Sequence, residues 1–169
     1  MHRDFLKYSI DKLNQYEARI ETCLDKLTYE QIWARGAERQ NAVGNLVLHL
    51  FGNLAQWILS GVGGAPDHRD RDAEFAARGD VSADELKLRL RESVKETVAV
   101  IAALTPEQLA ERIAVQGYDV SKLHAVYHVV SHFSEHAGQI VFATKLFTSD
   151  DLGFYRHLAN PLHGNLTPP

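Results

Sequence analysis

The sequence predicts an all-α fold: a four-helix bundle with long crossover connections and short extra helical turns, built as one domain over residues 1–169. Four long segments carry apolar residues at the spacing of three and four that gives a helix one buried stripe. Strand signals are nearly absent. In addition, a chain of 169 residues with 45% hydrophobic and 24% charged residues has the size and composition of one globular domain.

The four long helices have recognisable boundaries. We expect them at residues 4–27, 42–60, 83–101 and 122–148. Polar residues able to cap a helix stand before the last three of them: Asn41, Ser82 and Ser121. These caps leave the apolar stripe of each helix free to face a common core.

The connections carry the other structural predictions. Thr28 and Thr105 each begin a sequence typical of a short capped helical turn. Residues 61–80 are predicted to form a long loop, a feature that is often functional. Residues 112–120 could be extended, although no partner strand is evident. The tail, residues 149–169, is rich in glycine and proline and is expected to be irregular.

Composition and charge exclude several classes of protein. With 18 basic and 22 acidic residues, the chain lacks the basic surplus of a nucleic-acid binder, so no nucleic-acid partner is expected. Polar residues interrupt the most apolar window, residues 42–62, so no membrane span is expected. The single cysteine, Cys23, allows no internal disulfide and fits a reducing compartment, so we expect a cytoplasmic protein.

The histidines form the most specific pattern. His124, His128, His132 and His136 recur every four residues in the last helix, so neighbours in the series share a face. His49 lies within the apolar stripe of the second long helix, where a polar side chain needs a partner. This pattern predicts a three-histidine metal site that bridges the two helices, with water at the open position. Spacing alone does not say which pair binds, and a metal-free bundle remains the alternative.

A known family resembles this pattern. The segment HAVYHVVSHFSEHAGQIVFATKL, with NAVGNLVLHLFGNLAQWI upstream, resembles the DinB-like superfamily of metal-binding four-helix bundles. The resemblance rests on a histidine in the second helix and on an H-x-x-x-H pair followed by a small residue and Gly-Gln-Ile. It implies His49, His132 and His136 as metal ligands, with His128 beside them.

The resemblance also implies a function. Members of the superfamily include transferases and isomerases that use a low-molecular-weight bacterial thiol. Three neutral histidines leave a divalent ion its full charge, which can stabilise a thiolate. We therefore expect a metal-dependent transferase that activates such a thiol for attack on a small electrophile. Zinc or nickel is the expected ion, although imidazole also suits copper and iron. A homodimer is expected from the resemblance and the apolar tail.

Several residues are candidates to support this site. Asn45 and Asn53 lie one turn either side of His49 and could hold its second ring nitrogen. Arg69 and Arg71, in the charged sequence DHRDRDAEF, could hold the carboxylate of a thiol cofactor, and Arg71 is also a candidate catalytic residue. The alternative for this sequence is a solvated loop of mixed charge.

Glu135 is the other candidate catalytic residue. It lies in His132-Phe-Ser-Glu135-His136, which fits the H-x-x-E-H pattern of zinc peptidases. However, no glutamate follows Glu135 to serve as the third ligand of those enzymes. Two further functions remain open: a metal-dependent hydrolase that uses a metal-bound water, and a non-catalytic metal-binding bundle. A fourth protein ligand such as His128 would favour the latter.

Overall fold

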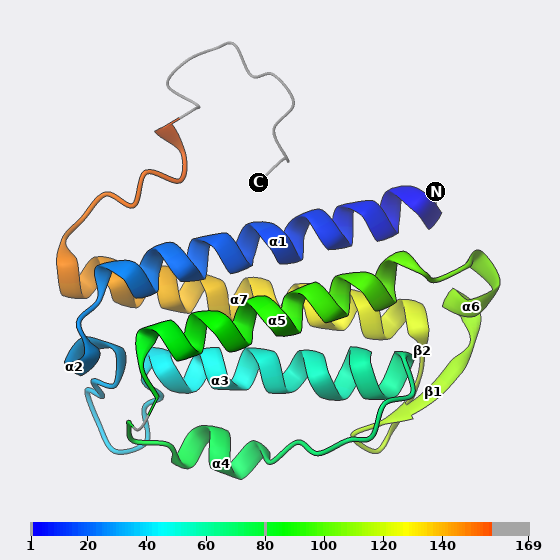
Figure 1. The fold of residues 1–169 in the computed structure, drawn as a ribbon, viewed down its shortest axis with the longest axis horizontal. Helices are drawn as coiled ribbons and strands as arrows, with labels where there is room; N and C mark the ends of the chain where they lie inside the picture. The colour runs from blue at the N-terminus through cyan, green and yellow to red at the C-terminus, as the bar shows by residue number, and fades with distance from the viewer. Residues whose placement is uncertain (1, 80, 157–169) are drawn as a thin grey trace.

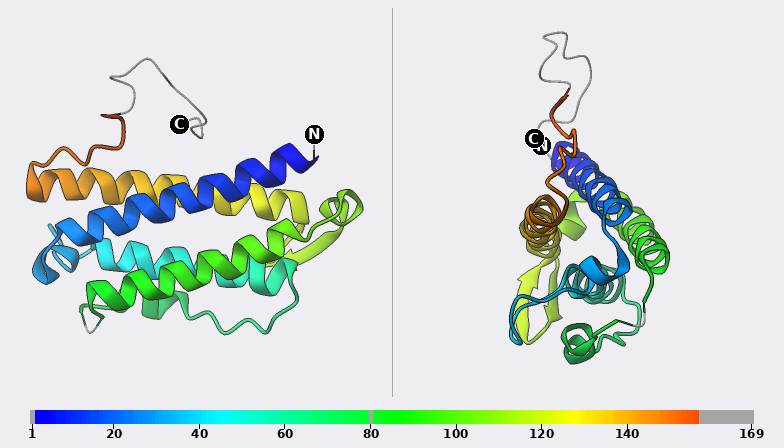
Figure 2. Two further views of the ribbon diagram at one scale, coloured as in Figure 1. Left: turned by 45° about the horizontal axis from the view of Figure 1, so that its top comes forward. Right: turned by 90° about the vertical axis from the view of Figure 1, so that its left-hand side faces the viewer.

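The predicted all-α bundle is confirmed in the computed structural model, which describes residues 2–79 and 81–156. The long helices are α1 (His2–Lys26), α3 (Val43–Leu54), α5 (Ala83–Ala102) and α7 (Lys122–Thr148) (Figure 1). Helix α1 packs against α5 and α7, and α3 packs against the same two helices from the opposite side. The four helices therefore surround one core, with α1 and α3 on a diagonal (Figure 2).

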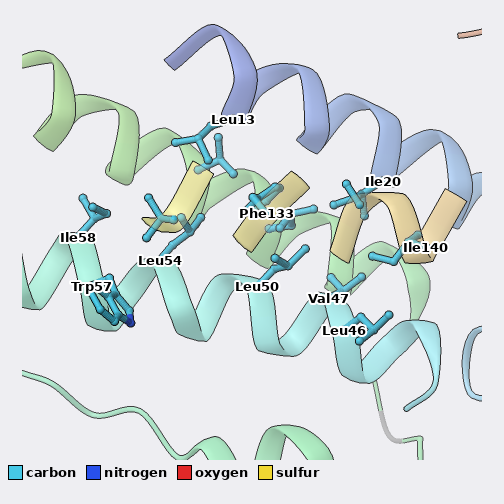
Figure 3. Packing of buried hydrophobic residues seen from close by; sticks show 14 of the residues in the cluster. Leu13, Ile20, Leu46, Val47, Leu50, Leu54, Trp57, Ile58, Phe133 and Ile140 are labelled. Atoms are coloured by element: carbon cyan, nitrogen blue, oxygen red, sulfur yellow. The ribbon is translucent and has the colours of Figure 1, made fainter. Parts of the chain in front are cut away.

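The core holds the helices that carry the histidines at a fixed separation. Fully buried side chains from three helices meet along the bundle (Figure 3), among them Leu13 and Ile20 of α1, Leu50 and Leu54 of α3, and Phe133 and Ile140 of α7. Each pair recurs at helical spacing, so every helix turns one continuous stripe inward. Because α3 and α7 both pack into this core, side chains on their adjoining faces are positioned by rigid elements.

Most predicted helix starts are confirmed. The side chains of Ser82 and Ser121 cap α5 and α7, as expected, and Thr28 and Thr105 form capping boxes for the short helices α2 (Tyr29–Ile32) and α6 (Pro106–Ala110). The start of α3 differs from the prediction, because Ala42 rather than Asn41 occupies the N-cap position. The side-chain oxygen of Asn45 accepts from the Ala42 backbone N–H at 3.0 Å, so one of the two hydrogen bonds of a capping box is present.

The long loop predicted over residues 61–80 contains helical structure that the sequence analysis did not predict. Helix α3 continues directly into a π-helix, η1 (Ala55–Val62), and a further helix, α4 (Arg71–Ala76), forms within the connection. This connection runs along the outside of the bundle beside α3 (Figure 1), and α4 packs against α3. The side chain of Asp70 caps α4 by accepting from Ala73 N–H at 2.9 Å.

Residues 112–121 form a β-hairpin, where the sequence showed no partner strand. The strands β1 (Arg112–Val115) and β2 (Tyr118–Ser121) pair with each other in antiparallel register. Gln116 and Gly117 form the turn, both with positive φ (51° and 79°), which suits the right-handed twist of two paired strands. The hairpin and α6 connect α5 to α7 in the sequence and lie at one end of the bundle (Figure 1).

The remaining structural predictions concern the tail and the membrane. Residues 149–156 are irregular apart from a short turn, as expected, and the rest of the predicted tail lies outside the described residues. No helix in the part of the chain that the structure describes has the length and apolar composition needed to cross a bilayer.

Candidate metal centre

Helices α3 and α7 bring three histidines together. His49 is buried on α3, and His132 and His136 lie one turn apart on the half-buried face of α7. One ring nitrogen from each lies within 4.8 Å of the other two. The Nε2 atoms of His49 and His132 are 2.9 Å apart, although 83 residues separate them in the sequence. These are the three residues that the family resemblance implied.

The spacing of these nitrogens fits a single metal ion. Imidazole nitrogens bind zinc at about 2.0–2.1 Å, so two of them on one ion lie about 3 Å apart. Within the described ranges, no further histidine, cysteine, aspartate or glutamate joins the cluster. Among the described residues the donor set is therefore three histidine nitrogens, the number of protein ligands typical of catalytic rather than structural zinc sites.

Glu74 of α4 orients His49. Its Oε2 atom lies 2.8 Å from His49 Nδ1, and Arg69 Nη2 lies 3.1 Å from the same nitrogen. A metal bound at Nε2 requires the proton on Nδ1, where Glu74 would accept it while the Nε2 lone pair faces His132 and His136. Burial by itself would raise the pKa of Glu74, but the hydrogen bonds from His49 and Arg69 and the charge of Arg69 hold this pKa below its usual value. The carboxylate is thus ionised and increases the basicity of the ligand.

The prediction that Asn45 or Asn53 holds His49 was wrong. Asn45 instead donates to the backbone oxygens of Glu74 and Ala77, at 2.8 and 3.0 Å. It therefore anchors α4 to α3 and sets the position of the Glu74 backbone. Asn53 is buried one turn beyond His49 on α3, but the place beside Nδ1 belongs to Glu74.

Arg69 neutralises Glu74 through a two-point contact. Its Nε and Nη2 atoms donate to the two carboxylate oxygens at 2.7 and 3.0 Å, and Nη1 donates to Gln56 at 3.0 Å. The Arg69 side chain is only 2% exposed. The predicted role of Arg69 was to bind a carboxylated thiol. This geometry does not fit that role, because the guanidinium of Arg69 is already paired with the Glu74 carboxylate.

Gly52 makes this close packing possible. A Cβ atom at this position of α3 would lie 2.0 Å from Glu74 Oε1 and 3.2 Å from Arg69 Nε. Only glycine lets the backbone of α3 approach the ion pair this closely. A glycine inside a helix costs up to about 1 kcal/mol relative to alanine, so its presence here reflects the contact that it permits.

The two histidines of α7 are also prepared to bind a metal. His136 Nδ1 lies 2.9 Å from the side-chain oxygen of Gln139, which accepts its proton and leaves Nε2 free. Burial, followed by the neighbouring His136 and His49, lowers the pKa of His132 to about 3. Burial is also the main cause of the lowered pKa of His136. Neutral imidazole is the form that binds a metal.

His128 lies beside the cluster and does not join it. Its ring stacks on Trp57 with the centroids 3.9 Å apart, and the His132 ring follows at 5.5 Å. This position agrees with the prediction that His128 lies next to the ligands. His124, one turn earlier, is exposed.

The two candidate catalytic residues occupy different positions. Glu135 is exposed and lines a depression with Tyr8 and Lys12 of α1, on a different side of α7 from the cluster. This position does not suit the general base that the H-x-x-E-H pattern would require. Arg71 is also exposed, and its guanidinium lies 4.9 Å from the Phe75 ring, which in turn packs against His49 at 4.7 Å.

A comparison with protein families decides the family of this chain. The family described as "Protein of unknown function (DUF1572)" matches residues 1–160. The chain belongs to the DUF1572 family. No curated protein matched in a separate comparison.

Solved structures with the same fold are also similar to this DUF1572 protein. A conserved protein from Enterococcus faecalis is 19% identical, with a TM-score of 0.70 over 85% of this chain and 97% of that one. A DinB-like protein from Bacillus subtilis is 17% identical, with a TM-score of 0.66 over 87% of this chain and 96% of that one. The fold that the resemblance implied is therefore confirmed, since a protein described as DinB-like shares it.

Proposed function

We propose that this DUF1572 protein is a metal-dependent transferase that activates a low-molecular-weight thiol for attack on a small electrophile. The observation that carries the proposal is the cluster of His49, His132 and His136, to which the described residues add no fourth ligand. A divalent ion, with zinc or nickel as the first candidates, supplies Lewis acidity that lowers the pKa of a bound thiol.

The residues at this site have different roles. The three histidines bind the ion through neutral nitrogens, and Glu74 and Gln139 each hold the proton on the other nitrogen of a ligand. Arg69 balances the charge of Glu74. The net charge of the ion is therefore retained toward the open side, where it favours an anionic sulfur.

Arg71 is the candidate for contact with the thiol or the electrophile. It is exposed, its guanidinium contacts the Phe75 ring, and that ring contacts His49. Unlike Arg69, it has no carboxylate partner among the ion pairs of the described residues. Its guanidinium can therefore meet an anionic group of a molecule held at the cluster.

The test begins with protein purified without an affinity tag, so that elemental analysis reports the native metal content. Metal-loaded protein is then mixed with a small thiol and a chromogenic aryl chloride, and thiol consumption is followed. We expect a rate above that of chelator-treated protein, and we expect His136→Ala to abolish both metal and rate. Metal-loaded protein without any thiol-dependent rate would contradict the proposal.

Two alternatives give different results in the same experiment. A hydrolase would consume an activated ester without thiol. A non-catalytic bundle would bind stoichiometric metal, show neither activity, and lose stability on chelation. The solvent-accessible His132 and His136 favour catalysis over a closed structural site.

We also propose a cytoplasmic homodimer. Two aromatic side chains on α7, Tyr127 and Phe142, are 64% and 65% exposed, which supports a further protein surface covering this helix. The mass in solution at micromolar concentration tests the dimer, and a monomer mass would contradict it.

A further inference from the structure

A cavity begins next to the metal cluster, between α3 and α7. These helices run in opposite directions (Figure 1), so residues before His49 on α3 face residues after His136 on α7. Leu46, one turn before His49, and Gln139, one turn after His136, both line this cavity. Its volume is about 530 Å³, within the range of about 300–1,000 Å³ typical of small-molecule sites.

The walls of the cavity are mostly apolar. Leu46, Ala143, Leu146 and Phe147 contribute hydrocarbon surface from the two helices. Leu146 is 68% exposed and Phe147 is 42% exposed, so the apolar wall continues to the outside of the molecule. An apolar wall of this size suits the hydrocarbon body of a small organic molecule.

Arg35 brings an unneutralised positive charge to this cavity. Its Nη atoms donate only to neutral oxygens: the Gln40, Phe75 and Ala77 backbones and the Asn45 side chain, at 2.6–3.1 Å. Its Nε is buried and has no acceptor. Arg35 as a whole is half-buried, and among the described residues no carboxylate forms an ion pair with it.

Arg78 reinforces this charge. It donates to the backbone oxygens of Phe75, Ala76 and Ala77, two of which also accept from Arg35. Burial, together with the charge of Arg78, lowers the pKa of Arg35. Two guanidinium groups therefore share one carbonyl-rich turn, and the described residues place no carboxylate between them. This arrangement favours a negative ligand nearby.

We infer that this cavity, lined by Arg35, Leu46, Gln139, Ala143, Leu146 and Phe147, binds the substrate of the metal site, and that this substrate is a small carboxylate with an apolar body. The inference rests on the proposed function, because it assigns the substrate class of the same cluster. The carboxylate pairs with Arg35, and the apolar body lies along α7. Gln139 connects the cavity to the cluster, since it also holds His136.

The test uses octanoate as the probe and octanamide as its neutral counterpart. Both are titrated by calorimetry into zinc-loaded and into chelator-treated protein. We expect octanoate to bind at least tenfold more tightly than octanamide, because only the carboxylate pairs with Arg35. Equal affinities, or no binding of octanoate, would overturn the inference.

Two variants locate the binding. Ala143→Leu fills the cavity without removing a hydrogen bond, and it should weaken octanoate at least tenfold while leaving the metal content unchanged. Ala99→Leu, at an exposed position of α5, is the matched control and should leave octanoate binding unchanged. Unchanged binding in Ala143→Leu would overturn the assignment of the cavity. Arg35→Gln should remove the preference for octanoate over octanamide, provided that its circular dichroism shows a folded protein.

A paramagnetic ion separates this inference from the proposed function. With Co²⁺ in place of zinc, the proton resonances of bound octanoate should broaden, because the cavity begins one turn from the ligands. Binding without broadening would place octanoate away from the cluster and overturn the inference. By contrast, octanoate that binds beside a metal-loaded cluster without any thiol-dependent turnover would contradict only the proposed function.

Discussion

Replacing Glu74 by glutamine tests the architecture around His49 most directly. Glu74→Gln keeps the shape of the side chain and removes its charge. In the wild-type protein the two carboxylate oxygens accept from His49 Nδ1 and from Nε and Nη2 of Arg69, at 2.7–3.0 Å. A glutamine has only one oxygen, so its amide group must face either the Arg69 donors or the His49 donor.

The magnitude follows from burial. The side chains of Arg69 and Glu74 are 2% and 9% exposed, so the substitution leaves a guanidinium buried without an anion. Removing one partner of such a pair costs about 3–5 kcal/mol, and the glutamine oxygen retains part of the contact, so we expect a loss of about 3 kcal/mol in the metal-free protein. Losing the carboxylate beside a histidine ligand should also weaken metal binding by about 10–100-fold.

Two measurements separate these effects. Urea unfolding in the presence of chelator gives the free energy of unfolding of the metal-free protein, and competition with a chromogenic chelator gives the metal affinity. Asp72→Asn removes a carboxylate from an exposed position of the same helix and should change either quantity little. A Glu74→Gln protein that matches Asp72→Asn in both measurements would refute the role assigned to the Arg69–Glu74 pair.

Three further predictions follow from the same site. His132→Ala and His136→Ala should each abolish tight metal binding whereas His124→Ala should not, by elemental analysis; equal losses in all three would show that the wrong pair was assigned. Gly52→Ala should weaken metal binding by about tenfold and lower the melting temperature by several degrees, since the new methyl group displaces Glu74; an unchanged affinity in titration would contradict the close contact. The pKa of His132 is about 3 in the folded protein and about 6.5 in the unfolded chain, so the unfolded chain binds more protons at acidic pH. The metal-free protein should therefore lose stability as the pH falls below about 6.5, and urea titrations showing equal or greater stability at pH 5 than at pH 7.5 would contradict this sign.

The bundle itself was predictable because its information is local and repeated. The apolar stripe of α1 extends from Leu6 to Leu24, and Ser82 and Ser121 cap the helices that follow them. Such repetition outweighs any single ambiguous residue. By contrast, α4 spans only six residues, which is too short for a periodic stripe. Its sequence signal is the cap at Asp70, followed by the acidic Asp72 and Glu74 in the first turn.

The metal cluster was predictable in part. The histidines that recur every four residues in α7 restricted the site to one helix face, while the choice of His132 and His136 needed the resemblance to a family. Glu74 was missed because it lies 25 residues from His49, in a charged segment that also suits a solvated loop. Gly52 carried the available signal, since a glycine within a helix indicates a close approach by another part of the chain. The neighbours of Arg35 could not be predicted, because they depend on backbone oxygens from α4 and the turn after it.

The metal ligands come from the bundle, and the residues that contact one of them come from the connection between α3 and α5. This division separates metal selectivity from reactivity. His49, His132 and His136 stand on helices fixed by the core, whereas Arg69 and Glu74 come from the segment that crosses outside α3. A substitution in that segment acts on one ligand, His49, through its contact with Glu74, and leaves the backbone positions of all three ligands to the bundle. One in the helices moves the nitrogens and so selects among ions of different size and geometry. Reactivity and metal selectivity can therefore be tuned independently in this scaffold, by engineering the connection for the first and the bundle for the second.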